Sequence, residues 1–491
     1  MAATSRIPYT SQAEVLDPVT MRVEGDIPSW LNGQLVRIGP GLFEFGEFEA
    51  ALPMDGMGLL HAFNIQDGGV TFKSRFVSSD ILKKNSEAKR FVCAEFGTPV
   101  SPDPSKGRFA KLKSMIKGDA ELSDNVNHNI CYWKEADVLL AIGLPMFVLD
   151  PVTLEHRMKV TLPESLGVDI VSEHVHIDKD GCLYLLGSHV RGRPSYHVVR
   201  VPPKGDVMSS FAAAELVFTV PGQYKVTPTS HHTFFMTENF FVIIECPLEI
   251  NVLKILTKGT IQEALKWDPS VTCKFHVFNR RTGRPIPQKI ESDSFLLMHS
   301  SNAYEYGDHL VLDMFNLRDL EFKDWFVPRK TMAQPNFDPT AAGSSSKESP
   351  PLRFVIPTNE DKITKADKGA NLVKLESEQA EAVKQSSSLL RLRSRPLCAG
   401  DGLQFPCINT AVTGKPYSFL YAGGYGESKC LEFAIGKFDV KTKEMTSWEA
   451  EKKQFLSEPV FVANPAGSSE DDGVLLVSLL DYATEKDRLM F

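Results

Sequence analysis

Short apolar runs separated by turn signals are the feature that most limits the folds open to this chain of 491 residues. Runs rich in β-branched, aromatic and aliphatic residues recur along the sequence, and examples are GGVTFKSRFV, MFVLD, CLYLLG, YHVVRV, FFVIIE, HLVLDMF and GVLLVSLL. Runs of this length bounded by Gly, Pro, Asn or Asp are typical of strands, because helices need apolar residues spaced three and four apart. The sequence therefore predicts an all-β fold.

Three of the predicted hairpin tips share one arrangement. In LDPVTLEH, FNRRTGRP and FDVKTKEM an Asp or Asn follows an apolar residue, and a Thr stands three residues later. So many short strands in so long a chain fit a β-propeller, whose blades take roughly 40–50 residues each. No linker divides the sequence, so we expect a single domain over residues 1–491.

One helix is predicted, in the segment KGTIQEALKW. Thr260 and Glu263 have the spacing of a capping box, in which each side chain bonds the backbone N–H of the other. Ile261, Ala264 and Leu265 form the apolar stripe of this helix.

Composition and charge restrict the partners and the compartment. The formal net charge is −8, which argues against nucleic acid as the main partner. No run approaches the roughly 18 apolar residues of a spanning helix, and the first residues, MAATSRIPYTSQAEV, lack the pattern of a signal peptide. The eight cysteines are scattered without CxxC pairs, which is typical of reduced thiols. We expect a cytoplasmic protein.

Three of the twelve histidines stand where predicted strands begin or end. They are His174 in SEHVHIDKDG, His232 in TSHHTFFMTENF and His299 in FLLMHSSNAYE, and they are 58 and 67 residues apart. If successive blades each contribute one His from the innermost strand, the three rings converge on the axis as a metal site. The alternative is that each is a core histidine bonded to one carbonyl. The histidines predicted to be solvated, because their surroundings are polar or turn-like, are His128, His156, His189, His197 and His309.

Several motifs in one order carry a resemblance to a known family. These motifs are IPSWLNGQLVRIGPGLFEFG, MDGMGLLHAF, EFGTPVSPDP, HVHIDKDG, HHTFFMTENF, MHSSNAYE, KADKGANLV, QFPCIN, SEPVFV and EDDGVLLVS, which together run through nearly the whole chain. The chain resembles the carotenoid cleavage oxygenases, in particular the animal branch with the β-carotene oxygenases and the retinal-epithelium retinoid isomerase. The resemblance implies a seven-bladed β-propeller with helical and loop insertions that form a cap over the axial site. In that family an axial Fe(II), held by four histidines, uses O2 to cleave a polyene double bond, and one animal member isomerises a retinyl ester instead.

Carried over motif by motif, the resemblance makes His174, His232 and His299 ligands of one Fe(II) per chain. Neutral imidazoles suit Fe(II), and an incompletely filled ligand shell leaves places for O2 beside the substrate. The family's fourth ligand lies in a motif like FHG near the C-terminus, and the sequence up to Phe491 contains no such motif. We therefore expect that the C-terminal end of the family's fold is missing and that the last blade is incomplete.

The residues expected behind the ligands also depart from the family. Family members place glutamates there, which accept the second ring N–H of three of the histidines. Glu458 in SEPVFV matches one of these glutamates, Gln404 replaces the second and Ile142 the third. Gln404 still accepts a hydrogen bond but carries no charge, and Ile142 accepts none. Because losing such a partner commonly costs about 10–100-fold in metal affinity or activity, we expect a weakened iron site.

A basic amphipathic stretch, DPSKGRFAKLKSMIKG at 103–118, predicts contact with a membrane surface. Phe109, Leu112, Met115 and Ile116 have helical spacing and lie among five Lys and Arg residues. A solvated helix that packs on the core is the alternative. The resemblance favours the membrane, since animal members extract apolar substrates from bilayers. The expectation is a cytoplasmic protein at the periphery of an internal membrane.

Three functions remain open on the sequence. The first is an iron-dependent oxygenase that cleaves a conjugated double bond of a carotenoid or apocarotenoid with O2. The second is a catalytically weakened relative that binds a carotenoid or retinoid, and the third is a retinoid isomerase. A three-His zinc hydrolase on a propeller is the reading outside the family, and it lacks an evident general base.

Overall fold

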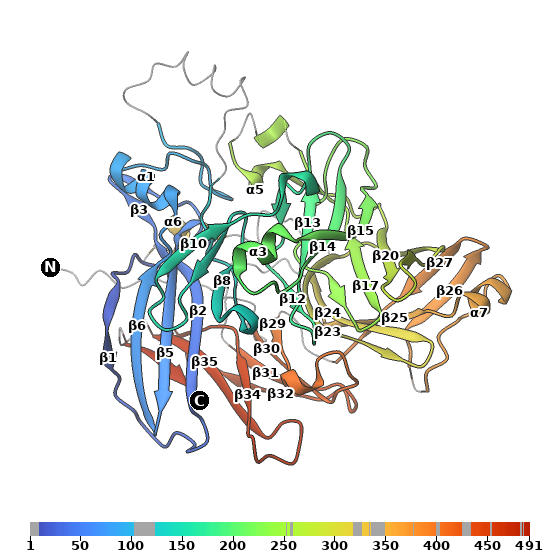
Figure 1. Cartoon of the computed structure of the whole chain (residues 1–491). Coiled ribbons are helices and arrows are strands. Elements are labelled where there is room, and N and C mark those ends of the chain that lie inside the picture. The colour runs from blue at the N-terminus through green and yellow to red at the C-terminus, as the bar shows by residue number, and fades with distance from the viewer. Residues whose placement is uncertain are drawn as a thin grey trace.

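The structure is a computed structural model, and most of its regular elements are strands in antiparallel sheets (Figure 1). It describes residues 9–491 with these exceptions: 103–122, 252, 256–258, 318–326, 333, 335–348, 377, 399–402, 425–433, 452–453, 482–483 and 485. Among the described residues, no helix is both long enough and apolar enough to cross a membrane.

The first three blades follow one another along the chain, each as one antiparallel sheet. Blade one has the strand order β1 (Val15–Thr20), β6 (Gly69–Phe76), β5 (Met57–Gln66), β2 (Gly33–Leu42). Blade two has the order β10 (His156–Val160), β9 (Met146–Leu149), β8 (Val138–Ala141), β7 (Ile130–Trp133). In blade three, two short strands pair the same partner, and the members are β11 (Ile170–Val171), β12 (His176–Ile177), β13 (Leu183–His189), β14 (Ser195–Val201) and β15 (Glu215–Pro221).

The next three blades complete the regular part of the fold. Blade four contains β16 (Phe235–Met236), β17 (Phe240–Glu245), β20 (Cys273–Asn279), β21 (Arg284–Pro285), β22 (Lys289–Ser292), β27 (Leu389–Arg393) and β26 (Glu381–Ser386). Blade five has the order β23 (Leu296–Tyr306), β24 (His309–Leu317), β25 (Leu352–Pro357), β28 (Arg395–Pro396). Blade six has the order β29 (Leu403–Cys407), β30 (Phe419–Gly424), β31 (Ala434–Asp439), β32 (Met445–Glu449).

The last sheet differs from these blades in width. Its strands are β33 (Gln454–Leu456), β34 (Val460–Ala463), β35 (Gly473–Asp481) and β36 (Lys486–Met490). β33 pairs residues 479–481 of β35 and β34 pairs residues 473–476, while residues 479–481 also pair β36 on the opposite edge. The backbone N–H of Ser457 donates to Ser478 O, so β33 and β34 follow the same edge of β35.

The described part of the chain thus forms six blades, and the predicted number of seven was wrong. β33 and β34 lie in line along one edge instead of side by side, so the last sheet is only three strands wide. Each of the six blades is at least four strands wide. The all-β propeller itself is confirmed.

The shared hairpin arrangement found in the sequence is a turn closed by the side chain. Asp150 Oδ1 accepts the backbone N–H groups of Val152 (2.8 Å) and Thr153 (2.7 Å). Asn279 and Asp439 accept the same pair of N–H groups two and three residues ahead. These bonds replace backbone partners that the turn leaves open. They close the β9–β10, β20–β21 and β31–β32 hairpins.

The predicted helix is shorter than its sequence pattern. Thr260 Oγ1 accepts the N–H of Glu263 (3.4 Å), as the capping box requires, but α5 ends after one turn (Ile261–Ala264). Leu265 instead begins β19 (Leu265–Trp267), which pairs β18 (Leu248–Ile250). The remaining elements are α1 (Asp80–Ala88), α3 (Val207–Ala212), α6 (Arg329–Met332), α7 (Glu360–Lys365), the hairpin of β3 (Glu44–Phe45) with β4 (Phe48–Glu49), and the 3-10 turns η1 (Pro53–Asp55), η2 (Lys134–Ala136), η3 (Glu164–Leu166) and η4 (Thr410–Val412).

Candidate metal centre

Three consecutive blades each bring one histidine to a common point. His174 lies between β11 and β12, His232 lies three residues before β16, and His299 lies on β23. These strands are the edge strands of blades three, four and five. One ring nitrogen of each histidine lies within 4.8 Å of one ring nitrogen of the other two. The structure therefore brings together the three histidines that the sequence singled out.

Hydrogen bonds between the blades hold the backbone beside these rings. The Ser172 hydroxyl donates to the carbonyl oxygen of His232 and accepts the N–H of His174 (3.3 Å). The hydroxyls of Thr233 and Ser300 are 3.1 Å apart, which ties blade four to blade five one residue after each ligand candidate. The three rings stand nearly perpendicular to one another, with centroids 4.6, 5.2 and 5.6 Å apart.

Burial keeps all three rings neutral at neutral pH. Desolvation lowers the pKa of His174 to about 3 and that of His299 to about 4. It also lowers the pKa of His232 well below its usual 6.5, and the neighbouring rings of His174 and His299 lower it further. A neutral imidazole has one free lone pair, which is the form that binds metal ions.

Gln404 decides which nitrogen of His299 is free. Its Oε1 lies 3.0 Å from Nδ1 of His299, and its Nε2 donates to the carbonyl oxygen of Asn316 (3.4 Å). Since the amide nitrogen is used by Asn316, Oε1 accepts and Nδ1 of His299 carries the proton. The lone pair is then on Nε2. Gln404 is 3% exposed, and it takes the place that the resemblance gave to a glutamate.

The nitrogen positions fit a shared metal ion. The Nε2 atoms of His174 and His232 are 3.1 Å apart. Two neighbouring ligands at ~2.1 Å from one ion lie ~3 Å apart, so this separation is that of two ligand atoms of the same metal. Three neutral imidazoles form a donor set that suits Fe(II), Zn(II) or Co(II).

The other two candidate partners form no bond with the three histidines among the described residues. Ile142 is 1% exposed and belongs to an apolar cluster that includes Trp133 and Leu140. The Glu458 carboxylate is 3.5 Å from the Arg37 guanidinium, which also donates to the Glu458 carbonyl oxygen (3.1 Å). Among the bonds of the described residues, none joins Glu458 to the three histidines.

Most of the remaining histidines form hydrogen bonds or ring contacts within the fold. His176 Nε2 lies 3.0 Å from the carbonyl oxygen of Phe234, and His231 packs on Tyr196 with ring centroids 4.0 Å apart. The prediction that His197 and His309 are solvated was wrong. They are 5% and 8% exposed, because neighbouring strands cover them.

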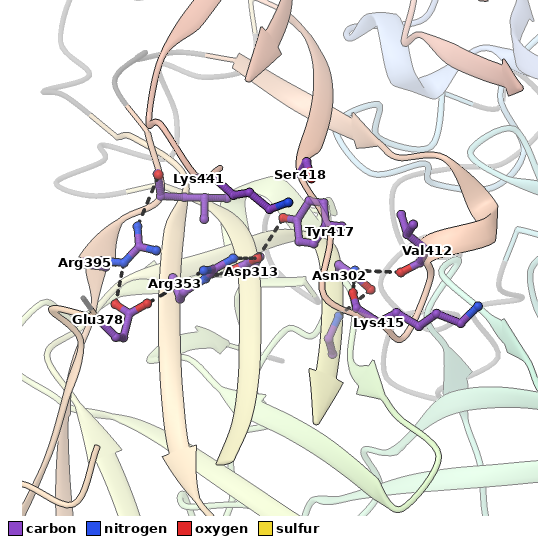
Figure 2. Close-up of polar contacts among 12 residues, drawn as sticks. Asn302, Asp313, Arg353, Glu378, Arg395, Val412, Lys415, Tyr417, Ser418 and Lys441 are labelled. Atoms are coloured by element: carbon purple, nitrogen blue, oxygen red, sulfur yellow. Dashed lines mark hydrogen bonds and ion pairs between the residues drawn. The ribbon is translucent and has the colours of Figure 1, made fainter. Parts of the chain in front are cut away.

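A polar clamp ties blade six to the strand that carries His299. Asn302, three residues after His299, donates to the carbonyl oxygens of Val412 (3.3 Å) and Lys415 (3.1 Å) and accepts the N–H of Gly414 (3.0 Å). These residues belong to the loop that follows β29, the strand of Gln404 (Figure 2). Asn302 therefore helps to fix the distance between blade six and blade five.

A buried chain of charges extends this clamp (Figure 2). The Tyr417 hydroxyl donates to Asp313 (2.8 Å), and Arg353 binds both oxygens of Asp313 (2.7 and 2.6 Å). Arg353 also lies 3.8 Å from Glu378, which Arg395 binds on its other oxygen. Asp313 is fully buried and each charge has an opposite partner, as burial of charge requires. Sequence reasoning missed this network, because its members lie far apart in the chain.

A family model described as retinal pigment epithelial membrane protein, RPE65, matches residues 9–490. The chain belongs to this family, the RPE65-like carotenoid oxygenases. A human protein named carotenoid-cleaving dioxygenase, mitochondrial, is 35% identical over 485 residues, covering 95% of this chain and 82% of the relative. The mouse protein named beta,beta-carotene 15,15'-dioxygenase is 31% identical over 493 residues, covering 98% of this chain and 85% of the relative.

Solved structures of carotenoid oxygenases have the same fold. A variant of the apocarotenoid oxygenase from Synechocystis aligns with a TM-score of 0.75 at 23% identity, over 98% of this chain and 91% of that chain. The cobalt-substituted Synechocystis enzyme aligns with a TM-score of 0.73 at 23% identity, with the same coverage. At this identity the similarity shows the fold alone.

The predicted membrane segment of this carotenoid oxygenase lies outside the described residues. Phe109, Leu112, Met115 and Ile116 all fall within 103–122. Contact with a membrane surface therefore stays a prediction, as does the cytoplasmic location.

Proposed function

We propose that this chain is an iron-dependent oxygenase that cleaves a conjugated double bond of a carotenoid or apocarotenoid with O2. The observation that carries the proposal is the convergence of His174, His232 and His299 as neutral imidazoles at one point. The curated relatives named for carotenoid cleavage support the substrate class.

His174, His232 and His299 would hold one Fe(II), with Gln404 keeping Nε2 of His299 free for it. When bound, Fe(II) supplies the one-electron chemistry that lets O2 react with a closed-shell polyene. The overall reaction breaks one C=C bond and the O–O bond and forms two C=O bonds, so each half of the polyene ends in a carbonyl group. Four electrons pass from the two carbons to O2, and the reaction needs no external reductant.

A cap over the site is part of the same proposal. The backbone N–H of Gln262 in α5 donates to Phe96 O (3.0 Å), and that of Arg329 in α6 donates to Ala51 O (3.0 Å). Phe43, Phe45 and Phe91 are fully or almost fully buried in the small apolar cluster beneath α1. These segments come from distant parts of the sequence and pack together outside the blades, so they would shield an apolar substrate from water.

The test is turnover of the purified chain after anaerobic loading with Fe(II). β-Carotene and an apocarotenal are supplied in detergent, and O2 is then admitted. We expect loss of the polyene absorbance and aldehyde products that carry oxygen from isotopically labelled O2. His232→Ala should abolish both signals. His156→Ala, the same change on β10 at the outer edge of blade two, should leave them unchanged.

Three other outcomes separate the alternatives. Carotenoid colour that persists through purification without turnover would indicate a binding relative, which Ile142 and Gln404 would explain. Conversion of a retinyl ester without cleavage would indicate an isomerase. A well-folded protein that binds no iron would contradict the proposed enzyme for this chain.

A further inference from the structure

His128 stands in the same structural position as the three clustered histidines, one blade earlier. It lies two residues before β7, the edge strand of blade two, whereas the cluster comes from blades three, four and five. His128, His174, His232 and His299 are 46, 58 and 67 residues apart. Four consecutive blades thus each bring one histidine to their edge strand.

The loop of His128 is tied directly to the candidate metal centre. Nδ2 of Asn129, the next residue, donates to the carbonyl oxygen of Glu173 (2.8 Å), which immediately precedes His174. This bond joins the residue after His128 to the residue before His174, so it holds the backbone of His128 next to the backbone of the candidate metal centre.

The side chain of His128 also faces open space, whereas His299 is buried. It lines a pocket of about 580 Å³ between β2, β7 and β34, together with Arg37, Tyr132 and Glu458. Its side chain is exposed, and among the described residues it forms no hydrogen bond and no ion pair. Rotation of its side chain towards the cluster breaks no bond with those residues.

Two carboxylates, those of Asp137 and Glu458, also line this pocket and have donor atoms for a metal. Asp137 accepts a hydrogen bond from the Tyr132 hydroxyl (2.8 Å). Glu458 lies beside Arg37, which has the opposite charge. Its carboxylate is engaged by Arg37, and moving it would leave the guanidinium, which is 15% exposed, without this partner. His128 has no such bond to give up. The donor next to the cluster that is free to move is therefore an imidazole.

We propose that His128 is a fourth protein ligand of the metal ion held by His174, His232 and His299. This inference rests on the proposed metal centre and adds to it a donor from blade two. An exposed ligand beside a pocket would also be the one that solvent or an incoming molecule displaces most readily.

The test is anaerobic titration of the full chain with Co(II), whose visible absorption reports the ligands around the ion. Co(II) is a suitable probe because a solved relative of the same fold exists in cobalt-substituted form. Wild-type protein is compared with His128→Ala and with His156→Ala. We expect His128→Ala to bind Co(II) at least about ten-fold more weakly than the wild type, because even the loss of a hydrogen-bond partner of a metal ligand typically weakens binding that much. We also expect the shape of its visible absorption band to change.

Imidazole added to His128→Ala provides the decisive comparison. If His128 is a ligand, free imidazole fills the vacated position and restores the wild-type band, while it leaves His156→Ala unchanged. An unaltered affinity and spectrum in His128→Ala would overturn the inference and leave the three-His centre intact. A weaker affinity with the wild-type band shape and no response to imidazole would overturn it too. No Co(II) binding by the wild-type chain would contradict the metal centre itself.

Discussion

At the scale of single residues, Gln404 is the partner that most directly sets the chemistry of a metal ligand. It accepts from Nδ1 of His299 and so leaves Nε2 free. We predict that Gln404→Leu lowers Co(II) affinity about ten-fold, because the ring loses the acceptor that fixes its proton and orientation. Gln404→Glu keeps an acceptor at the same place and should bind Co(II) at least as tightly as the wild type. Equal affinities of the Leu variant and the wild type, measured by titration, would show that this bond does not orient the ring.

Glu95 gives the protein a pH dependence of its own. Its pKa is raised from the usual 4.5 to about 8. Burial is the largest cause, the nearby carboxyl groups of Asp55 and Asp124 act in the same direction, and hydrogen bonds from Ser123 and Asn125 act against it. A carboxyl whose pKa is raised by folding stabilises the folded state fully below pH 4.5, and this contribution is lost as the pH rises through 8.

Glu95→Gln should therefore remove a fall in stability between pH 4.5 and 8. The measurement is the urea midpoint of unfolding across this range, for which we expect a flatter profile in the variant and a higher midpoint at pH 8 and above. Glu238→Gln, an exposed glutamate paired with Lys179, is the control and should follow the wild-type profile. If the urea midpoints of Glu95→Gln and the wild type change with pH in the same way, ionisation of Glu95 does not lower the stability of the folded protein.

The local sequence around each histidine correctly predicted that His174, His232 and His299 lie together. It gave the wrong solvent exposure for other histidines. The spacing and the family motifs identified the three rings, and the structure brings them together. His197 and His309 have polar neighbours in the sequence, yet strands from elsewhere in the chain cover them. Burial by distant segments leaves no trace in a local pattern, whereas His128, which was also expected to be solvated, is exposed.

At the scale of elements, local rules worked where the bonds are local. The Asp and Asn turns and the Thr260 cap depend on residues two or three positions apart, and the structure contains them all. The helix predicted around α5 ends after one turn, because residues Leu265–Trp267 pair with β18 instead of continuing the helix. Strand pairing depends on residues far apart in the sequence, and the local periodicity of apolar residues does not show which segments pair.

The pairing of β24 with β25 carries a charge pair whose loss we expect to be costly. Arg353 binds fully buried Asp313 through two bonds (Figure 2). Arg353→Met keeps the apolar stem but leaves the carboxylate buried with only the Tyr417 hydroxyl, and such a loss costs about 3–5 kcal/mol of unfolding free energy. Urea unfolding measures it.

The control for this prediction is an arginine of similar reach at the surface. Arg391 pairs with Asp293, whose side chain is 91% exposed, so Arg391→Met should cost about 1 kcal/mol or less. Equal losses in the two variants would mean that Asp313 is protonated or reached by water once Arg353 is gone.

At the scale of the whole molecule, the number of blades depends on how strands are placed in space. Seven blades were expected from the family resemblance, and not from a count of the strand runs in this sequence. In the structure β33 and β34 share one edge of β35, and the last sheet stays three strands wide. Counting runs cannot distinguish two strands in line from two strands side by side.

The first and last sheets of the propeller lie next to each other (Figure 1). Apolar side chains from the two sheets form one cluster. Leu476 on β35 is 3% exposed in a cluster with Leu35 of β2, Phe63 of β5 and Val70 of β6. Leu476 is more than 400 positions away from these three residues in the sequence, so this contact closes the ring between segments far apart in the chain. Arg37 and Glu458 add a polar contact between the same two sheets.

We predict that Leu476→Ala destabilises the protein by about 2–5 kcal/mol, since it removes buried methyl groups and leaves a cavity at this junction. Leu480→Ala is the matched control, because Leu480 lies on the same strand but is 36% exposed, and its loss should stay within about 0.5 kcal/mol. The urea midpoints of both variants are compared with the wild type, and His299-dependent Co(II) binding reports whether the axis is disturbed. If Leu476→Ala unfolds at the wild-type midpoint, the ring does not need this contact, and each blade is stabilised chiefly by its immediate neighbours in the chain.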